Sequence, residues 1–518
     1  MKLWSKTEAV SQSSKFLERF GRSSWYKVQS VRNDSFNSGY TYLLTGEFRQ
    51  MSRSLLINLG NINRIKPLYT ISCCYLTSTA PTISRKIFSK PNQPNIVLVD
   101  AVRTPFLQSR TMFKNMMAMD LQRAALLALM DRAKVNIHDV GHIVCGTVIQ
   151  EYKTSNVARE AALMAGFSKN IPAHTVTLAC ISSNVAITDV MNMLSAGYCN
   201  AGIAGGVELL SDVPIRYNRK VRSAFLSLDK AKKFSDKLTA IRKIALNFFS
   251  PELPAVAEFT TGETMGHSGD RLAAAFGVSR REQDEFAIRS HMLADRASKE
   301  NLLSDIVPVF VPGSKPMVVR RDNGIRVSSM EKLSQLKPAF VKSHGTVTAG
   351  NSSFLTDGAS ASLIMTEDYA IKKGYKPKAY LRDFQYVAQD PTDQLLLSPA
   401  YAIPKLMDKV GLTLKDIDVF EIHEAFAGQI LANLNAMDSD YFCKEMLQRP
   451  TKYGRIAEEK LNTWGGSLSL GHPFGATGVR LVSHAVNRLQ HEKKHLGIVA
   501  ACAAGGHGVA MLIENYPK

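Results

Sequence analysis

Short apolar runs alternate with amphipathic segments from Pro94 to about residue 211. The apolar runs have the length and composition of buried strands, and the segments between them repeat apolar residues at the spacing of a helix face. We predict strands over residues 95–106, 143–150, 171–180 and 200–210, and helices over 119–133 and 181–197. Buried strands that alternate with helices predict a layered α/β fold.

The alternation recurs near residue 376, with a strand over 378–388, a helix over 402–411 and a strand–helix unit over 417–437. Two such rounds predict two similar halves. Between them the alternation is lost and the chain becomes basic and rich in helical pattern, which indicates an inserted domain. The predicted divisions are a leader or disordered extension over 1–93, a first half over 94–211 and 345–370, a loop domain over 212–344, and a second half over 371–518.

The apolar run Leu496–Ile513 has His507 as its only strongly polar side chain. Its length would suffice for a membrane span, but a titratable ring at the centre, flanked by glycines, argues against one. Two runs of strand length joined by a Gly-rich turn predict a buried hairpin instead, with Cys502 just before the turn.

The bulk composition is ordinary for soluble globular domains, with 45% hydrophobic and 21% charged residues among 518. The seven cysteines include no CxxC pair, which argues against a zinc ribbon and favours free thiols in a reducing compartment. The net charge of +19 is concentrated, since residues 1–99 contribute +10 (14 Lys/Arg, 4 Asp/Glu) and residues 216–243 contribute +8 (10 Lys/Arg, 2 Asp). A nucleic-acid surface would spread its charge more broadly, so no nucleic-acid partner is expected.

No Asp or Glu occurs between Glu47 and Asp100, and this interval is basic and rich in Ser, Thr and Leu. That composition is typical of a mitochondrial transit peptide, and a disordered basic tail is the alternative. The best such segment begins at Met51. Met51 is therefore either the working start or is preceded by a non-essential extension, and cleavage is expected between about residue 75 and residue 95.

Four motifs place reactive side chains near the ends of predicted strands: Cys180 in TLACISSN, His423 in EIHEAFAGQ, His472 in NTWGGSLSLGHPFGATG, and Cys502 before the hairpin turn. Each alone has an ordinary interpretation as a buried thiol, a half-buried ring or a tight turn. The Gly-rich loop around His472 could also cradle phosphate, but it lacks the GxxxxGK[ST] pattern.

Together the four motifs are more specific, because open α/β sheets collect their sites at strand ends. Cys180 precedes a predicted helix, whose N–H groups and dipole favour a thiolate, and the imidazole of His472 can act as its base. His423 and backbone N–H groups can donate to a developing oxyanion. Cys502 can carry protons, because a thiol pKa is easily tuned toward neutrality. The set is suited to acyl chemistry.

These motifs resemble those of the thiolase family. ACISSN, HEAFAGQILAN, NTWGGSLSLGHPFGATG and AACAAGGHG occur in the family's order, and the resemblance covers about residues 94–518. It is closest to the long-chain 3-ketoacyl-CoA thiolases of mitochondrial fatty-acid oxidation. The resemblance implies a duplicated five-layer α/β/α/β/α core with a helical loop domain. It also implies that Cys180 is the nucleophile, His472 its base, Cys502 the proton carrier and His423 a holder of the thioester oxygen.

The resemblance further implies ping-pong cleavage of a 3-oxoacyl-CoA by CoA into acetyl-CoA and a shortened acyl-CoA. CoA is then a co-substrate, with no permanently bound cofactor and no metal. A homodimer within a hetero-oligomer that contains a hydratase/dehydrogenase α-subunit is expected, at the matrix side of the mitochondrial inner membrane. The segments ETMGHS, LKPAF and TAGNSS are similar to those that wrap pantetheine. Ordinary loop packing is the alternative for the CoA contacts that this predicts: Met265, Phe340, Ala349, Gly350, Ser353 and Phe426.

Three positions depart from the family pattern. Most thiolases carry Asn at the place of His423. Ala504 stands where a glycine usually offers its N–H beside that of Cys180; alanine retains the N–H, so only the local φ is in question. His507 replaces a glutamine of close relatives, and no role is predicted for it.

Residues 223–254 repeat apolar positions at helical spacing among lysines and arginines, and Pro251 ends the run. This pattern predicts a basic amphipathic helix, which suits an anionic membrane surface. Contact with CoA or a partner, or a merely solvated face, are the alternatives. The predicted stripe comprises Ala231, Phe234, Leu238, Ile241, Ala245 and Phe248.

Three rival functions remain open at this point. A biosynthetic acetyl-CoA acetyltransferase runs the same chemistry in reverse, and the motifs do not fix direction. Condensing enzymes of fatty-acid synthesis share the fold but lack a second cysteine, so Cys502 argues against them. A non-catalytic lipid carrier on the same fold is disfavoured by the retention of all four reactive groups.

Overall fold

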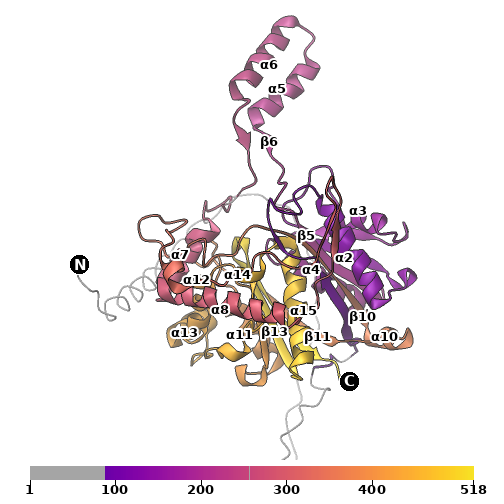
Figure 1. Cartoon of the computed structure of the whole chain (residues 1–518), viewed down its shortest axis with the longest axis vertical. Coiled ribbons are helices and arrows are strands. Elements are labelled where there is room, and N and C mark those ends of the chain that lie inside the picture. The colour runs from indigo at the N-terminus through magenta and orange to yellow at the C-terminus, as the bar shows by residue number, and fades with distance from the viewer. Residues whose placement is uncertain (1–87, 91, 256, 518) are drawn as a thin grey trace, which may run out of the picture. The chain divides into compact units, whose positions relative to one another are not determined.

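The computed structural model describes residues 88–517 except for residues 91 and 256. The predicted leader, with its start codon and cleavage site, therefore falls almost wholly outside the described residues. A ten-stranded mixed sheet organises the described chain (Figure 1), in the order β12-β13-β14-β11-β1-β10-β5-β3-β4, with β2 paired to β10. The strands are β1 (Ile96–Arg103), β2 (Leu107–Gln108), β3 (His142–Gly146), β4 (Ala173–Val176), β5 (Ala201–Glu208), β10 (Thr356–Thr366), β11 (Ala379–Ala388), β12 (Val419–Ile422), β13 (Leu496–Ala503) and β14 (His507–Asn515).

The sheet consists of two repeats joined by a short antiparallel pairing of β1 with β11. In the first repeat β1 pairs antiparallel with β10, β10 antiparallel with β5, and β5 parallel with β3. The second repeat has the same sequence of pairings through β11, β14, β13 and β12. The two repeats also share an irregularity: the strand register shifts just before Asp100 in β1 and just before Asp383 in β11. The two predicted halves are therefore similar in their strand pairings and in the place of their register shift.

Helices complete five layers. The outer layer of the first repeat consists of α2 (Ala118–Ala133) and α3 (Val157–Met164), and helix α11 (Pro399–Val410) packs on the second repeat beside α12 (Ala427–Met437). Between the two halves of the sheet lie α4 (Ser182–Ser195) and α15 (Thr477–His491), which contact each other. Apolar side chains from both central helices and from both halves of the sheet form one buried cluster. The duplicated α/β/α/β/α architecture is as predicted.

The inserted segment contributes the remaining elements, among them α7 and α8, which pack against α12. In chain order they are β6 (Arg216–Tyr217), α5 (Arg219–Lys230), α6 (Phe234–Asn247), β7 (Pro251–Glu252), α7 (Met265–Ala275), α8 (Arg280–Lys299), β8 (Val309–Val311), β9 (Met317–Val319) and α9 (Met330–Ser334). Short helices elsewhere include α10 (Glu367–Lys372), α13 (Asp440–Leu447) and α14 (Ser467–Leu470).

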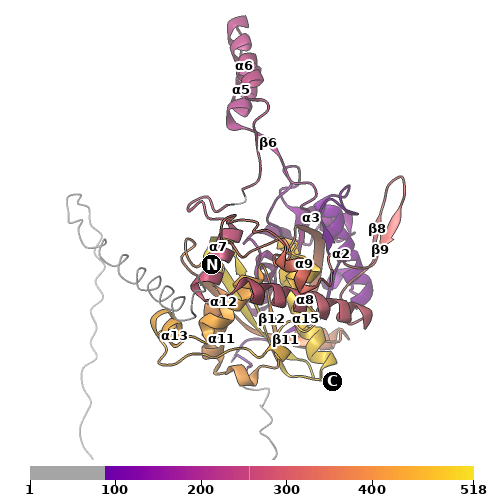
Figure 2. The same ribbon diagram turned by 60° about the vertical axis from the view of Figure 1, so that its left-hand side comes forward.

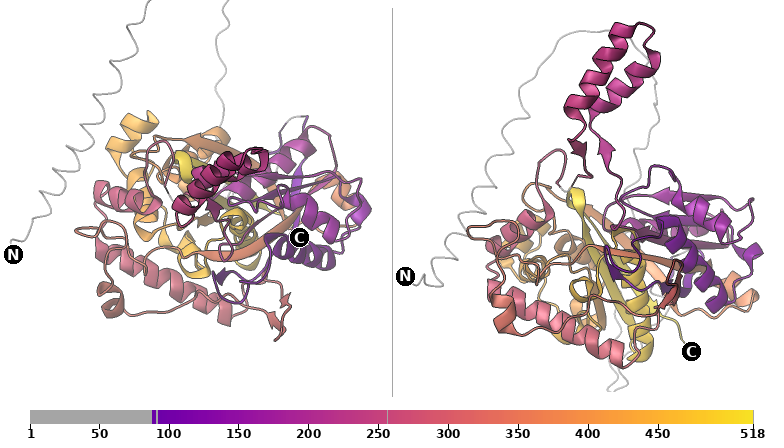
Figure 3. Two further views of the ribbon diagram at one scale, coloured as in Figure 1. Left: turned by 90° about the horizontal axis from the view of Figure 1, so that it is seen from above. Right: turned by 45° about the horizontal axis from the view of Figure 1, so that its top comes forward.

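The basic segment forms two helices, so the prediction of a single helix was wrong. Helix α5 ends at Lys230, the following Ala231 is extended, and α6 begins after Lys233, which is also extended. Ala231 therefore belongs to the turn and not to an apolar stripe. Lys230 and Lys233 would be neighbours on a continuous helix, and this like-charge crowding disfavours one. Figures 2 and 3 show the α5–α6 hairpin standing clear of the sheet layers on its β6–β7 stem.

The run Leu496–Ile513 forms the predicted hairpin, in which β13 and β14 pair over their full lengths. Among the described residues, no helix combines the length and the apolar character that crossing a membrane requires.

Candidate active site

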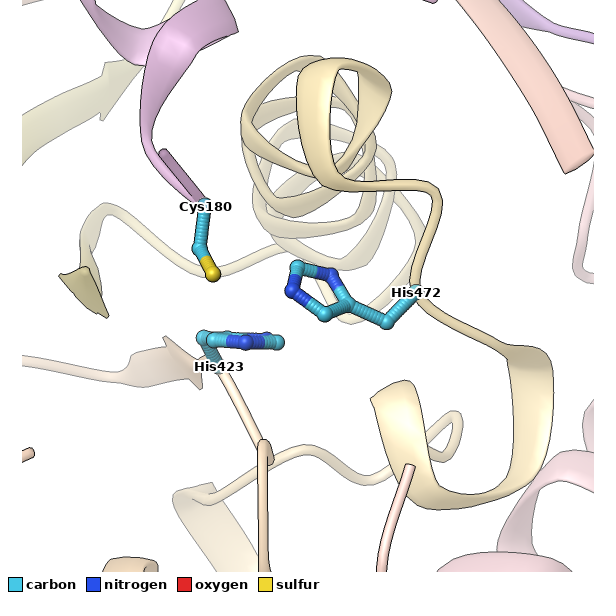
Figure 4. A group of neighbouring side chains, drawn as sticks. All are labelled: Cys180, His423 and His472. Atoms are coloured by element: carbon cyan, nitrogen blue, oxygen red, sulfur yellow. The ribbon is translucent and has the colours of Figure 1, made fainter. Parts of the chain in front are cut away.

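Three of the four predicted reactive side chains meet between the repeats. One ligand atom each from Cys180, His423 and His472 lie within 4.8 Å of one another. Figure 4 shows the Cys180 sulfur directed toward the two rings, which come from separate loops. Cys180 immediately precedes the N-cap of α4, His423 follows β12, and His472 lies between α14 and α15. The first repeat thus supplies the thiol and the second supplies both imidazoles.

The backbone presents Cys180 from a tight turn. Ala179 has a φ of 45°, a left-handed conformation that costs a non-glycine residue roughly 1 kcal/mol. Burial raises the pKa of the Cys180 thiol to about 12, the nearby Glu208 carboxylate adds to this, and the backbone N–H of Ala504 opposes it by donating to the sulfur. The resting residue is therefore a neutral thiol.

Cys502 lies opposite Gly508 at the turn end of the β13–β14 hairpin and is buried. Burial raises the pKa of its thiol, and the Cys180 sulfur raises it further, so the two sulfurs lie within electrostatic range of each other. In the turn that follows, Gly505 (φ 80°) and Gly506 (φ 75°) adopt left-handed backbone conformations. Ala504 has no positive φ, so its side chain leaves the position of its N–H undisturbed.

The hydrogen bonds of His472 identify its tautomer. Its Nδ1 lies 2.7 Å from Thr477 Oγ1, and that hydroxyl donates its only hydrogen to the carbonyl of Pro473 at 2.9 Å. The Thr477 oxygen must therefore accept from Nδ1–H, because a hydroxyl has a single donor. The buried Nε2 has no partner among the described residues. It is the basic nitrogen, available for the Cys180 proton.

His423 presents the complementary tautomer. Its Nδ1 lies 2.9 Å from Ser467 Oγ, which also accepts a hydrogen bond from Arg480 Nη2 at 2.7 Å. A guanidinium cannot accept, so Nδ1 is the one acceptor within reach of the Ser467 hydrogen among the described residues, and the hydroxyl donates to it. The proton of the neutral ring then resides on Nε2, which is buried and has no partner in the described part of the chain.

Both rings are neutral near pH 7. Burial lowers the pKa of His472 to about 3, with the positive charge of Arg480 as a second cause. Burial, the neighbouring His472 and Arg480 hold the pKa of His423 well below its usual range. The rings lie 4.1 Å apart between centroids. The cluster therefore combines an unprotonated nitrogen on His472, an N–H donor on His423 and a protonated thiol on Cys180.

Sequence reasoning missed four residues around this cluster. Ser467, Thr477 and Arg480 orient or polarise the rings, and Glu208 is a buried carboxylate beside Cys180. Glu208 accepts from the backbone N–H groups of Val148, Ile149 and Gly475. Burial raises its pKa to about 7 against these bonds. Its position as the only acid in a wholly buried apolar strand was a readable signal.

The predicted CoA contacts fall into two groups. Phe340 and Ser353 contact the loop after His423: Phe340 packs edge-on against Phe426 of that loop at 6.1 Å, and Ser353 N–H donates to the Ala425 carbonyl at 2.9 Å. Met265 begins α7, which lies beside Phe340. Gly266 beside Met265 leaves room for the Phe340 ring, since a Cβ there would lie 2.2 Å from it.

Ala349 and Gly350 instead line a separate cavity of about 240 Å³ together with Arg326 and Lys332. His507, for which no role was predicted, opens β14 and lies outside the thiol–imidazole cluster.

One thiol and two imidazole nitrogens are also a possible ligand set for zinc. Both Nδ1 atoms already have hydrogen-bond partners, so the sulfur and His472 Nε2 could bind an ion directly. His423 Nε2 could bind it only after losing its proton.

A layered two-repeat fold with a thiol and a neutral base between the repeats defines the protein as an acyltransferase. Two family models match, "Thiolase, N-terminal domain" over residues 96–368 and "Thiolase, C-terminal domain" over residues 375–515. The chain belongs to the thiolase family.

Individual relatives agree with this assignment. The chain is 68% identical to a probable 3-ketoacyl-CoA thiolase of Caenorhabditis elegans, covering 85% of this chain and 99% of the relative. It is 61% identical to the mitochondrial trifunctional enzyme subunit beta of Bos taurus, covering 89% and 98%. Among solved structures, the Bacillus anthracis acetyl-CoA acetyltransferase superposes with a TM-score of 0.69 at 31% identity, covering 82% and 99%.

Proposed function

We propose that this protein is a 3-ketoacyl-CoA thiolase of mitochondrial fatty-acid β-oxidation, which cleaves a 3-oxoacyl-CoA with CoA into acetyl-CoA and a shortened acyl-CoA. The observation that carries the proposal is the proximity of the Cys180 thiol to the imidazole of His472, whose Nε2 is unprotonated. High identity to a 3-ketoacyl-CoA thiolase and to a trifunctional enzyme β-subunit supports the same activity.

The first half-reaction forms an acyl-enzyme. His472 Nε2 takes the Cys180 proton, and the thiolate attacks the 3-keto carbon, whose oxygen becomes negative and accepts from the Ala504 and Cys180 N–H groups. Collapse of this adduct breaks the C2–C3 bond, and the electron pair passes to the acetyl-CoA enolate. His423 Nε2–H donates to the enolate oxygen, and the Cys502 thiol protonates C2. Acetyl-CoA leaves, and the shortened acyl group remains on Cys180.

The second half-reaction restores the enzyme. CoA gives its thiol proton to the Cys502 thiolate and attacks the acyl carbonyl. The Cys180 thiolate departs and recovers its proton from His472. Every proton is returned, so no cofactor is consumed, and the kinetics are ping-pong. Met265, Phe340, Ala349, Gly350, Ser353 and Phe426 are the proposed CoA contacts.

The decisive experiment compares CoA-dependent thiolysis of 3-oxohexadecanoyl-CoA with that of acetoacetyl-CoA. A β-oxidation thiolase cleaves the long substrate with the higher kcat/KM. Cleavage of acetoacetyl-CoA alone would identify an acetyl-CoA acetyltransferase, the activity named for the Bacillus anthracis structure. Cleavage of neither would leave only the non-catalytic lipid carrier.

The domain divisions belong to the same proposal. Residues 1–93 act as a mitochondrial leader, 94–211 with 345–370 and 371–518 form the catalytic halves, and 212–344 form the loop domain. The bovine relative is named a subunit beta, which supports an α-subunit partner for this chain. In our proposal this partner is a hydratase/dehydrogenase, and the protein is a homodimer within the complex.

The α5–α6 hairpin is the proposed contact with the matrix face of the inner membrane. Its side chains include Lys232, Lys233 and Lys237, which are exposed. Apolar side chains are exposed on the same hairpin, namely Phe225, Leu226, Phe234, Leu238 and Ile241. Exposed apolar groups among cations suit an anionic bilayer surface.

A further inference from the structure

We propose that Ser467 and Arg480 are positioning residues that hold His423 as a hydrogen-bond donor toward the substrate. Two buried hydrogen bonds connect them in series, 2.7 Å from Arg480 Nη2 to Ser467 Oγ and 2.9 Å from Ser467 Oγ to His423 Nδ1. The three residues have zero solvent exposure. Water therefore does not compete for these bonds.

The direction of the series follows from the donor inventory. A guanidinium only donates, so Ser467 Oγ must be the acceptor toward Arg480. Ser467 Oγ has a second lone pair, but if it also accepted from Nδ1–H its own hydrogen would have no acceptor among the described residues. Donation from the Ser467 hydroxyl to His423 Nδ1 pairs every group. A ring that accepts at Nδ1 and remains neutral carries its proton on Nε2. The result is a donor directed at the cluster where the thioester oxygen is proposed to lie.

Arg480 fixes the direction of these two hydrogen bonds because its guanidinium can donate a hydrogen bond but cannot accept one. Its charge is fully buried, 3.8 Å from Glu421 Oε2, and its Nε and Nη1 have no hydrogen-bond partners among the described residues. A buried cation that is only partly neutralised raises the free energy of any second positive charge nearby. It therefore opposes protonation of His423, which would otherwise replace the neutral donor with an imidazolium.

The hydrogen bonds of the series orient His423 and not His472, although the charge of Arg480 lowers the pKa of both rings. His472 takes its orientation from Thr477 and the Pro473 carbonyl, so activation of Cys180 does not pass through Ser467. This inference rests on the proposed thiolase function, in which His423 stabilises the enolate and His472 activates the thiol. Loss of the Ser467 hydroxyl should impair enolate formation selectively.

The test measures two reactions on each variant. Enolate formation is followed as solvent deuterium exchange into the C2 position of acetyl-CoA, and activation of Cys180 as its alkylation by iodoacetamide, located by mass spectrometry. Ser467→Ala should lower the exchange rate about tenfold or more while the Cys180 alkylation rate stays within about twofold of wild type. Removing a whole oxyanion donor lowers a rate on the order of 100-fold. Ser467→Ala removes only the residue that orients the donor, so a smaller loss of exchange rate is expected.

Ser469→Ala is the matched control. Ser469 is buried on the same short helix, but its hydroxyl bonds Ser290 and the Gly466 carbonyl. This variant should keep both rates. Ser467→Thr retains the hydroxyl and should recover most of the exchange. Equal loss of exchange and alkylation in Ser467→Ala, or no loss of either, would overturn the proposal.

A spectroscopic measurement on the wild-type protein covers the case in which the variants fold poorly. In protein labelled with ¹⁵N-histidine, His423 should show an unprotonated Nδ1 and a protonated Nε2. The opposite tautomer would overturn the inference. Absence of deuterium exchange in the wild type would instead count against the proposed function, so the two failures are distinguishable.

Discussion

The rings of His423 and His472 lie 4.1 Å apart, centroid to centroid, and are inclined by 44°. Their Nδ1 atoms have different partners, a donating serine for His423 and an accepting threonine for His472. The two neighbours thus present opposite Nε2 states, a donor and an acceptor. A single pocket can then withdraw a proton from sulfur and stabilise negative charge on oxygen without changing its overall charge.

Replacement of Cys180 tests the nucleophile. Cys180→Ser should lower the turnover of CoA-dependent thiolysis on the order of 1,000-fold or more, because a hydroxyl is a far poorer nucleophile beside a neutral imidazole. Steady-state thiolysis at saturating CoA measures this. Near-ultraviolet circular dichroism confirms the fold of the variant, and a variant that keeps most of its turnover would remove Cys180 from this role.

Replacement of Cys502 separates the two halves of the chemistry. Cys502→Ala should abolish measurable deuterium exchange at C2 of acetyl-CoA, because no other thiol among the described residues is proposed to protonate the enolate. Formation of the acyl-enzyme on Cys180, detected by mass spectrometry of the intact protein, should persist in part. Complete loss of acylation together with exchange would contradict this division.

Glu208 should make stability depend on pH. Its pKa is raised from 4.5 to about 7 in the folded protein by burial, so the native state holds a proton that the unfolded chain releases within this window. Stability should therefore fall by about 3 kcal/mol as pH rises from below 4.5 to above 7. Urea unfolding at pH 5 and pH 8 measures the difference.

Glu208→Gln should remove this dependence, whatever its effect on absolute stability. An amide nitrogen next to the Val148 and Gly475 N–H groups is expected to destabilise the variant at every pH. The informative quantity is thus the change with pH, and parallel curves for the wild type and the variant would refute the assignment.

Zinc should inhibit the enzyme reversibly. The Cys180 sulfur and His472 Nε2 can bind the ion directly, and His423 Nε2 can bind it after losing its proton, so zinc occupies groups that the proposed reaction uses. Micromolar Zn²⁺ should slow both thiolysis and alkylation of Cys180, EDTA should restore both, and EDTA alone should leave the activity unchanged. Unaltered alkylation in the presence of zinc would show that the cluster does not bind it.

The α5–α6 hairpin should bind anionic vesicles. Changing Lys232, Lys233 and Lys237 together to glutamine should weaken binding to phosphatidylglycerol vesicles about 100-fold, since each lysine near such a surface contributes about 1 kcal/mol. Co-sedimentation measures the binding. Changing Lys114, Lys153 and Lys169 together to glutamine is the control, because these lysines are exposed in the first repeat. Thiolysis of acetoacetyl-CoA should be unaffected in both variants, and unchanged vesicle binding would count against the proposed contact.

The layered fold was predictable because its strands are buried on both faces, so they read as continuous apolar runs. Strand ends were less predictable: the strand predicted over 171–180 is β4 (Ala173–Val176), because the chain must turn before Cys180, with Ala179 in a left-handed conformation. The break at Ala231 was not predictable from apolar spacing, which is similar for one long helix and for two antiparallel ones.

The reactive groups were predictable because each stands in a motif near the end of a strand. Their supporting residues were not. Arg480 lies among apolar and polar residues of α15 and looks like an ordinary helix position, and only the fold shows it buried next to Ser467. Tautomers depend on such partners, so the opposite states of His423 and His472 could not be inferred from spacing.

The division of the pocket between the two repeats has a consequence for the ancestry of the chain. Each repeat retains the same strand pairings and even the same register shift, yet one contributes a single sulfur and the other contributes a second sulfur and both rings. Two identical copies could not have built so lopsided a pocket. The two copies must therefore have diverged from each other, and neither alone now carries the whole set of groups.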